Sequence, residues 1–292
     1  MPSLKDVQMK IVGVKKTSQI TKAMNMVAAA KLRGAQQKME DFRPYANQFN
    51  SAMTSMSGSL ETSQFPLMEV REVNAVELIV VTSDRGLCGS FNANILKVAE
   101  KMTKQLEDEG KSVSFVCVGK KAHAFLKKTG KVRKSYLDIM GTFQMFNARE
   151  IAQDAAANFL AGEADEVRLL YGSFVSVASQ KPAVNALLPI QPVAADESEV
   201  TESSDAGDFI YEPSPTEIMD VLLPLYLNVM VYRSMLEVGA SEHAARMSAM
   251  NNATNACADI IDNLTMIYNK ARQSGITAEL MDIVGGAEAL KG

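Results

Sequence analysis

Apolar residues recur at alternating steps of four and three along the first sixty residues of the chain. The positions are Leu4, Val7, Ile11, Val14, Ser18, Thr21, Asn25, Ala28, Leu32, Ala35, Met39, Phe42, Ala46, Phe49, Met53, Met56 and Leu60. A repeat of this kind over many heptads predicts a helix whose apolar stripe winds around a partner, as in a coiled coil. At about 1.5 Å per residue, the helix would reach roughly 80 Å.

Polar residues interrupt this stripe at Ser18, Thr21 and Asn25. The neighbouring apolar residues lie one position over, at Ile20, Met24 and Val27. We therefore expect the helix to present a different face in this region. Pro44 lies inside the pattern and should kink the helix or break it locally, because its missing N–H removes one hydrogen bond of the helix.

A second heptad repeat occupies the C-terminal part of the chain. Its positions are Ile218, Leu222, Leu225, Val229, Tyr232, Leu236, Gly239, His243, Arg246, Met250, Ala253, Cys257, Ile260, Leu264, Ile267 and Ala271. Ser214 suits an N-cap and Pro215 a first-turn position, so this helix should begin near residue 215. Pro224 should disturb its second or third turn. Running to about Val284, the helix would exceed its partner by roughly 15 residues, which is an overhang of about 20 to 25 Å at one tip.

Between the two helices, the periodicity changes to short apolar runs separated by helical segments. The expected strands are 77–81, 113–118, 135–140, 166–174 and 185–190, and the expected helices are 92–107, 120–128 and 148–160. Strands that alternate with helices predict a mostly parallel sheet covered by helices. The expected fold class is therefore α/β: a long antiparallel coiled coil of the N- and C-terminal helices with an inserted Rossmann-like α/β domain.

This organisation divides the chain into four segments. They are the N-terminal coiled-coil helix 1–60, the inserted α/β domain 73–192, an acidic loop 193–213 and the C-terminal coiled-coil helix 214–292. The loop contains no Lys or Arg, is rich in Ser and is poor in large apolar residues, which predicts a mobile excursion. Its stretch 194–207 matches no known motif.

The distribution of charge says more about partners than the total does. The 30 Lys+Arg and 34 Asp+Glu give a formal net charge of −4, which argues against nucleic acid as a main partner. The first fifty residues nevertheless contain nine Lys or Arg and three Asp or Glu. Because these basic residues surround the place where the stripe is interrupted, we expect a partner with an acidic surface there.

Membrane spans and disulfides are not expected. No stretch approaches the roughly 18 to 20 uninterrupted apolar residues that a span needs, and the first ten residues have no apolar signal-peptide core. We therefore expect the chain to stay in the compartment where it is made. Cys88, Cys117 and Cys257 are widely spaced and odd in number, so neither a disulfide framework nor a zinc site is predicted.

The loop from Thr82 to Ser90 is the clearest candidate for phosphate binding, because backbone amides at a helix start attract anions. It lacks the Gly-Lys-Ser/Thr of a P-loop and the GxGxxG dinucleotide fingerprint, so a tight strand-to-helix turn is the better interpretation. No second His or Cys stands at metal-ligand spacing from His123 or His243, and Cys88 has no visible His base. We predict no catalytic residue, no cofactor-binding residue and no metal site.

Five separate stretches carry a more specific signal. They are ITKAMNMVAAAK (20–31), RPY (43–45), TSDRGLCG (82–89), YEP (211–213) and YNKARQSGITAELMDIVGGA (268–287). Together they resemble the gamma subunit, or central shaft, of F-type ATP synthases, and the resemblance covers essentially the whole chain.

The resemblance implies a rotor subunit of a proton-translocating ATP synthase. In that family, the coiled coil stands inside a ring of alternating alpha and beta subunits, and its rotation imposes different nucleotide affinities on the three catalytic beta subunits. The inserted domain resembles the foot that grips the epsilon subunit and the membrane ring of c subunits. The implied protein is not an enzyme by itself and not a homo-oligomer. It is a peripheral membrane protein on the cytoplasmic face of a bacterial inner or plasma membrane.

The resemblance also assigns contact residues. By similarity, the surface facing the alpha or beta subunits should include Met24, Lys31, Arg246, Arg272, Gln273, Thr277 and Glu279. The apolar tip that turns in the top of the ring should include Ile276, Leu280 and Ile283. The foot that touches the c ring should include Asp208, Tyr211 and Glu212. The paired cysteines of plastid relatives are missing, so no thiol switch of that kind is expected.

Two alternatives from other functional classes remain at the level of sequence. A stand-alone nucleotide-binding α/β protein would use the loop 83–90 and bind nucleotide alone. A self-associating coiled-coil scaffold would form homodimers through the two stripes. The missing phosphate motif counts against the first alternative, and the C-terminal signature counts against the second.

Overall fold

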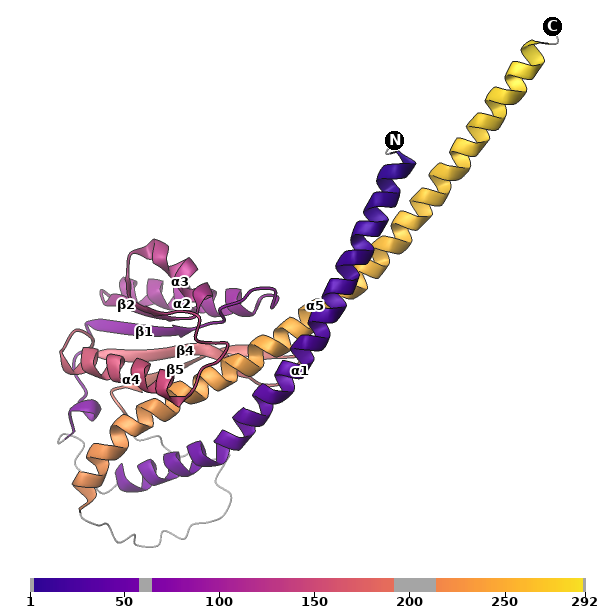
Figure 1. The fold of residues 1–292 in the computed structure, drawn as a ribbon. Helices are drawn as coiled ribbons and strands as arrows, with labels where there is room; N and C mark the ends of the chain where they lie inside the picture. The colour runs from indigo at the N-terminus through magenta and orange to yellow at the C-terminus, as the bar shows by residue number, and fades with distance from the viewer. Residues whose placement is uncertain (1–2, 58–64, 192–213, 291–292) are drawn as a thin grey trace. The chain divides into compact units, whose positions relative to one another are not determined.

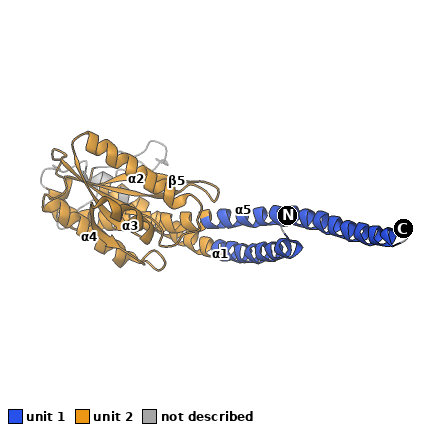
Figure 2. Cartoon of the chain, turned by 90° about the horizontal axis from the view of Figure 1, so that it is seen from above, with its two compact units in different colours: residues 1–29, 246–292 blue, residues 30–245 orange. Residues whose placement is uncertain are grey.

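The computed structural model describes residues 3–57, 65–191 and 214–290. Its elements, in chain order, are α1 (Leu4–Ser57), the 3-10 turn η2 (Pro66–Met68), β1 (Ala75–Val81), α2 (Phe91–Asp108), β2 (Ser112–Val118), α3 (Lys120–Leu126), the 3-10 turn η3 (Lys127–Thr129), β3 (Val132–Tyr136), α4 (Met145–Leu160), β4 (Glu166–Phe174), β5 (Gln180–Leu188) and α5 (Pro215–Ala289) (Figure 1). The chain divides into two compact units, residues 1–29 with 246–292 and residues 30–245 (Figure 2). The two long helices, α1 and α5, contribute to both units.

The larger unit contains a five-stranded sheet in the order β3-β2-β1-β4-β5. The first four strands are parallel and β5 pairs with β4 in the antiparallel direction. Helices α2 and α3 cover one face of the sheet, and α4 lies on the other (Figure 1). The central strand β1 is buried along almost its whole length, as expected for a parallel strand covered on both faces. The predicted α/β domain with a mostly parallel sheet is confirmed.

Two strands begin three or more residues before their predicted starts. The third strand is Val132–Tyr136 rather than 135–140, and the last is Gln180–Leu188 rather than 185–190. Basic residues concealed the start of β3, since Arg133 and Lys134 are ion-paired within this unit. Only the final residues of β5 are buried, so the apolar pattern marked only its end. Its first residues become a strand by pairing with β4, a partner that local sequence does not reveal.

Helix α5 is buried or partly buried on every side between Leu225 and Ala245, because in this unit it contacts both α1 and the region around the sheet. The ring of Tyr232 packs edge-on against Phe42 of α1, with centroids 4.9 Å apart, and against Phe143, at 5.9 Å. The Ser241 hydroxyl donates to the carbonyl oxygen of Gly172 in β4, at 3.1 Å. A single apolar stripe is therefore an incomplete description of this part of the helix.

Neither proline inside the long helices breaks its helix, so of the kink or local break expected at Pro44 the break is wrong. Both α1 and α5 continue through Pro44 and Pro224. Each proline lies on an exposed face, as does the residue four positions earlier. The carbonyl group that loses its helical partner can therefore bond to water, which lowers the cost of the missing N–H.

One segment of α5 is long and apolar enough to cross a membrane by length and composition alone. Most of that segment is buried within the protein, which is the pattern of a core helix. The acidic loop 193–213, Met56 as a side chain and Leu60 of the first stripe lie outside the described residues.

Candidate functional site on the paired helices

In the smaller unit, the start of α1 runs antiparallel to the last part of α5, from Arg246 onward (Figure 2). The α1 positions that are buried or partly buried along this stretch include Val7, Ile11, Val14, Ser18, Thr21, Asn25 and Ala28. These are the positions of the predicted stripe. The prediction that the N- and C-terminal segments form an antiparallel helical pair is confirmed.

The predicted change of face at the polar interruption is wrong. Thr21 is buried and its Oγ1 lies 2.7 Å from Oγ1 of Thr254, while Asn25 Nδ2 donates to the carbonyl oxygen of Met247 at 2.8 Å. The apolar Ile20 and Val27 are instead 60% and 57% exposed. Thr21 and Asn25 keep their place in the stripe because each finds a hydrogen-bond partner on the facing helix.

After Thr254 the predicted stripe on α5 is right at Cys257, Leu264 and Ala271, which are buried or partly buried, and wrong at the positions between them. Ile260 and Ile267 are 46% and 50% exposed, which corrects their assignment to the contact face. Ile261 and Tyr268, one residue further along, are partly buried in their place. Thr254 rather than Ala253 faces Thr21, and the following contacts continue from Thr254 in alternating steps of three and four.

Helix α5 extends past the start of α1 within this unit. The Thr21–Thr254 contact sets the antiparallel register, so Leu4 is level with about residue 271. Every residue from Ile276 to Ala289 is exposed. These 14 residues correspond to about 20 Å of unaccompanied helix, in agreement with the expected overhang. The predicted tip residues Ile276, Leu280 and Ile283 all lie on it.

The predicted contact residues fall into separate groups. Met24 is partly buried and Arg246 is buried, and the Asn25–Met247 hydrogen bond puts them at the same level of the pair. Arg272, Gln273, Thr277 and Glu279 are exposed near and beyond the start of α1. Lys31 is exposed and belongs to the larger unit. The predicted foot residues Asp208, Tyr211 and Glu212 lie outside the described residues. The helices do not bring these positions into one cluster.

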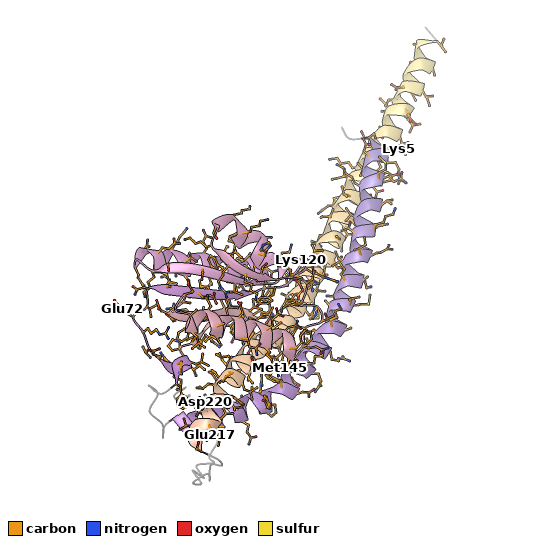
Figure 3. The ribbon with its side chains drawn as sticks, turned by 60° about the vertical axis from the view of Figure 1, so that its left-hand side comes forward. Lys5, Glu72, Lys120, Met145, Glu217 and Asp220 are labelled. Carbon is orange, nitrogen blue, oxygen red and sulfur yellow. The ribbon has the colours of Figure 1, made fainter. Side chains whose placement is uncertain are left out.

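The loop that follows β1 directs its polar groups inward. The Asp84 carboxylate accepts hydrogen bonds from the backbone N–H groups of Lys120, Asp138 and Met140, at 2.9, 3.1 and 2.9 Å. Lys120 and Met145, the first residues of α3 and α4, lie at the same edge of the sheet (Figure 3). Asp84 therefore ties three connections together at the carboxyl edge of the sheet.

The neighbouring residues of this loop are similarly engaged. Thr82 Oγ1 accepts from the backbone N–H of Ala122 at 2.8 Å, and Asn92 Oδ1 accepts from the backbone N–H of Ser83 at 3.1 Å. Gly119 approaches so closely that a Cβ there would lie 2.3 Å from the carbonyl oxygen of Thr82. The tight-turn interpretation of this loop is supported, because its side chains bond to the protein's own backbone.

A charged network inside the larger unit was not anticipated from the sequence. Glu77 of β1 is fully buried and its carboxylate bonds to Arg133 Nε at 2.6 Å and to Asn158 Nδ2 at 3.0 Å. Arg133 and Lys134 also pair with Asp154. Burial raises the pKa of Glu77, and the Arg133 guanidinium only partly offsets that effect. The sequence signal that could have revealed this network is the glutamate inside the apolar run AVELIVV, because a buried carboxylate calls for a cation beside it.

The three cysteines are free thiols and all are buried. Among residues 3–57, 65–191 and 214–290, no cluster of three His, Cys, Asp or Glu side chains could hold a metal ion.

We expect Cys117 to resist alkylation in the folded protein. Burial raises the pKa of its thiol from 9.0 to about 12, so the reactive thiolate is scarce at neutral pH. The contribution of this thiol to stability is complete below pH 9 and is lost as the pH rises toward 12, because the unfolded chain ionises first. Iodoacetamide labelling at pH 8, read by peptide mass with and without urea, checks this. Equal labelling of Cys117 in both conditions would contradict it.

Comparisons with known proteins agree with one another. A family model described as ATP synthase matches residues 3–290. ATP synthase gamma chains from Desulfotalea psychrophila and Nitratidesulfovibrio vulgaris are 65% and 51% identical to this chain, and each alignment covers both proteins completely.

Solved structures show the same fold. A chain of the central stalk and c ring of Tetrahymena thermophila mitochondrial ATP synthase matches with a TM-score of 0.62 and 25% identity, covering 80% of this chain and 99% of that chain. A chain of the Euglena gracilis mitochondrial ATP synthase matches with a TM-score of 0.67 and 21% identity, covering 98% of this chain and 94% of that chain. The second likeness is evidence for the fold alone.

Proposed function

Because this chain belongs to the family of ATP synthase gamma chains and is a central-stalk subunit of an F-type ATP synthase, we propose that its paired helices transmit rotation without catalysing the reaction themselves. Its partners are the alpha and beta subunits of the catalytic hexamer, the epsilon subunit and the c ring. Proton flow through that ring would turn the stalk, and the turning helices would change the nucleotide affinity of each beta subunit in sequence. This is coupling between distant sites through rigid-body motion.

The overhang of α5 is the observation that carries this proposal. A lone helix of 14 exposed residues, from Ile276 to Ala289, leaves large apolar side chains in water. Such a surface is typical of a binding site. A ring of subunits with an apolar lining would cover Ile276, Leu280 and Ile283 while leaving them free to turn.

The absence of catalysis by the chain itself is supported by the loop 82–90. Thr82, Ser83 and Asp84 all bond within the protein, so they have little remaining capacity to hold a phosphate. In an F-type ATP synthase, the beta subunits supply the catalytic sites. We therefore assign the chain a mechanical role in ATP synthesis.

We assign the contact surfaces by the family resemblance. Met24 and Arg246 would face the alpha or beta subunits at one level of the helix pair, Lys31 would face them from the larger unit, and Arg272, Gln273, Thr277 and Glu279 would do so nearer the tip. Asp208, Tyr211 and Glu212 would contact the c ring. The assembled protein would be peripheral to a bacterial inner membrane, on its cytoplasmic face.

The test compares ATPase activity of the full chain alone, of matched alpha and beta subunits, and of the three together, with the mass of each complex. We expect no activity from the chain alone, one chain per three alpha–beta pairs, and faster turnover in the complete assembly. Substituting Ile276, Leu280 and Ile283 together by Asp should weaken incorporation. A matched triple substitution of Asn263, Asn269 and Ser274 by Asp, at exposed positions of the same helix that have no assigned contact, serves as the charge control.

Two results would overturn the proposal. Hydrolysis or tight nucleotide binding by the isolated chain would restore a catalytic role. Failure of the chain to enter the alpha–beta hexamer would remove the mechanical one.

A further inference from the structure

A layer of polar residues crosses the interface of the paired helices. Thr21 and Asn25 of α1 occupy stripe positions that an ordinary coiled coil would fill with apolar side chains. They bond to Thr254 and to the Met247 carbonyl oxygen of α5. We use "polar layer" for Thr21, Asn25, Met247 and Thr254.

The two threonines form a short hydrogen-bond chain. Thr21 Oγ1 lies 3.0 Å from the Ser18 carbonyl oxygen, and Thr254 Oγ1 lies 2.8 Å from the Met250 carbonyl oxygen. The hydroxyls are 2.7 Å apart, and each has one proton. Either Thr21 donates to Thr254, which donates to Met250, or the order is reversed and ends at Ser18. Both arrangements leave each hydroxyl proton bonded, so the pair is satisfied in either direction.

Asn25 holds the two helices at the same relative height through a different hydrogen bond. Its Nδ2 donates at 2.8 Å to the carbonyl oxygen of Met247, which lies inside α5 and can also accept from its own helix through its second lone pair. A short amide side chain can reach that oxygen only when the two helices stand at this height relative to each other.

A slipped register would lose these bonds. Sliding one helix by a heptad, roughly 10 Å, would again place the apolar stripe of one helix opposite the apolar stripe of the other. It would place Thr21 opposite Met247 or Ile261 and leave its hydroxyl without the Thr254 partner. Each threonine would still donate to its own helix, at Ser18 or Met250, so the loss falls on the Thr21–Thr254 bond and on the Asn25 amide, which would leave the Met247 carbonyl oxygen. Apolar layers tolerate such a slip, whereas an amide that loses its partner in the interface is disfavoured.

We propose that the polar layer is a register lock that keeps α1 and α5 from sliding past each other when the pair is loaded. Thr21, Asn25 and Thr254 are positioning residues in this role: they hold the outward-facing side chains of the two helices at matching heights. This inference rests on the rotary function proposed above, because sliding matters only if the helices carry torque. Without the lock, hydrolysis would continue while part of each rotation was lost as slip.

The test replaces the polar layer by apolar residues of similar shape, Thr21→Val, Asn25→Leu and Thr254→Val, in the complete enzyme in membrane vesicles. Replacing both partners of a hydrogen bond by apolar groups is nearly neutral for stability, so the variant should fold and assemble. The matched control is Thr17→Val with Thr265→Val. Those hydroxyls are exposed and bond only to their own helices, at Gly13 and Ile261.

The measured quantity is proton pumping per ATP hydrolysed. We expect the ratio to fall at least about two-fold in the polar-layer variant, with ATPase activity retained, and to stay at the wild-type value in the control. A thermal unfolding midpoint equal to or above that of the wild type, together with the lower ratio, separates lost positioning from lost folding. An unchanged ratio in the polar-layer variant would overturn the proposal.

A second measurement reads the register directly. Ser18 lies three residues before Thr21 and Cys257 three residues after Thr254, so Ser18→Cys should face the native Cys257. We expect oxidation by copper–phenanthroline to join that pair as a disulfide efficiently in the otherwise wild-type enzyme and less efficiently when the polar layer is removed. Equal yields would count against the lock. If the wild-type chain itself supported no coupled pumping, the rotary function would fail instead.

Discussion

Gly119→Ala should cost about 4 kcal/mol or more of unfolding free energy, one of the largest losses available from a single methyl group in this protein. Gly119 has φ of +99° and ψ of 147°, a combination that residues with a Cβ rarely adopt. A Cβ there would stand 2.3 Å from the backbone oxygen of Thr82, and a backbone atom cannot rotate away. The ends of β1 and β2 would have to separate, which would also strain the Thr82 bond to Ala122.

Gly130→Ala is the matched control. Gly130 has φ of +70°, but a Cβ there meets nothing within 4 Å. Only the backbone strain remains, which should cost about 1 kcal/mol. Urea unfolding of the full chain, followed by circular dichroism at the helical minimum, measures both losses. Similar losses for the two variants would show that the close approach to Thr82 does not matter.

Arg133→Met should cost about 3 kcal/mol at neutral pH, because it leaves a fully buried carboxylate without its cation. Glu77 would keep only the hydrogen bond from Asn158, while Asp154 would still pair with Lys134. Lys134→Met is the control, since it removes a more exposed cation from the same network without touching Glu77. That change should cost less than about 1 kcal/mol.

The stability loss in Arg133→Met should depend on pH in a direction that follows from the pKa of Glu77. Burial already raises the pKa of Glu77 above 4.5 despite Arg133, so its contribution to stability is complete below pH 4.5 and is lost as the pH rises through the raised value. Without Arg133, the pKa of Glu77 rises further. The loss in Arg133→Met should therefore be larger at pH 7 than at pH 5, as urea unfolding at the two values can show.

The double variant Glu77→Leu with Arg133→Met completes this comparison. Removing both charges leaves no buried carboxylate to neutralise, so stability should recover much of the single-variant loss and should lose the difference between pH 5 and pH 7. A double variant as unstable as Arg133→Met would mean that the arginine acts through packing rather than through Glu77.

Three elements of the larger unit show what the local sequence pattern could and could not predict. The predicted strand 166–174 has the bounds of β4, and the predicted helix 92–107 is α2 to within one residue at each end. Each carries its own signal: buried apolar residues in the strand, and an apolar face in the helix. The start of β5 carries none, because its residues are half-exposed and become a strand only through β4.

The heptad repeats by themselves determined the two long helices, their antiparallel pairing and the overhang of α5, because those features follow from the period and length of an apolar stripe. Tertiary structure decided what the polar interruption does. Thr21 and Asn25 read as a break in the stripe when only their own helix is considered, yet they remain inside it because Thr254 and the Met247 carbonyl oxygen face them. It also decided the fate of Glu77, whose cation lies 56 residues away. In each case a polar group was satisfied by a partner distant in sequence, and only folding brings such a partner within hydrogen-bond reach.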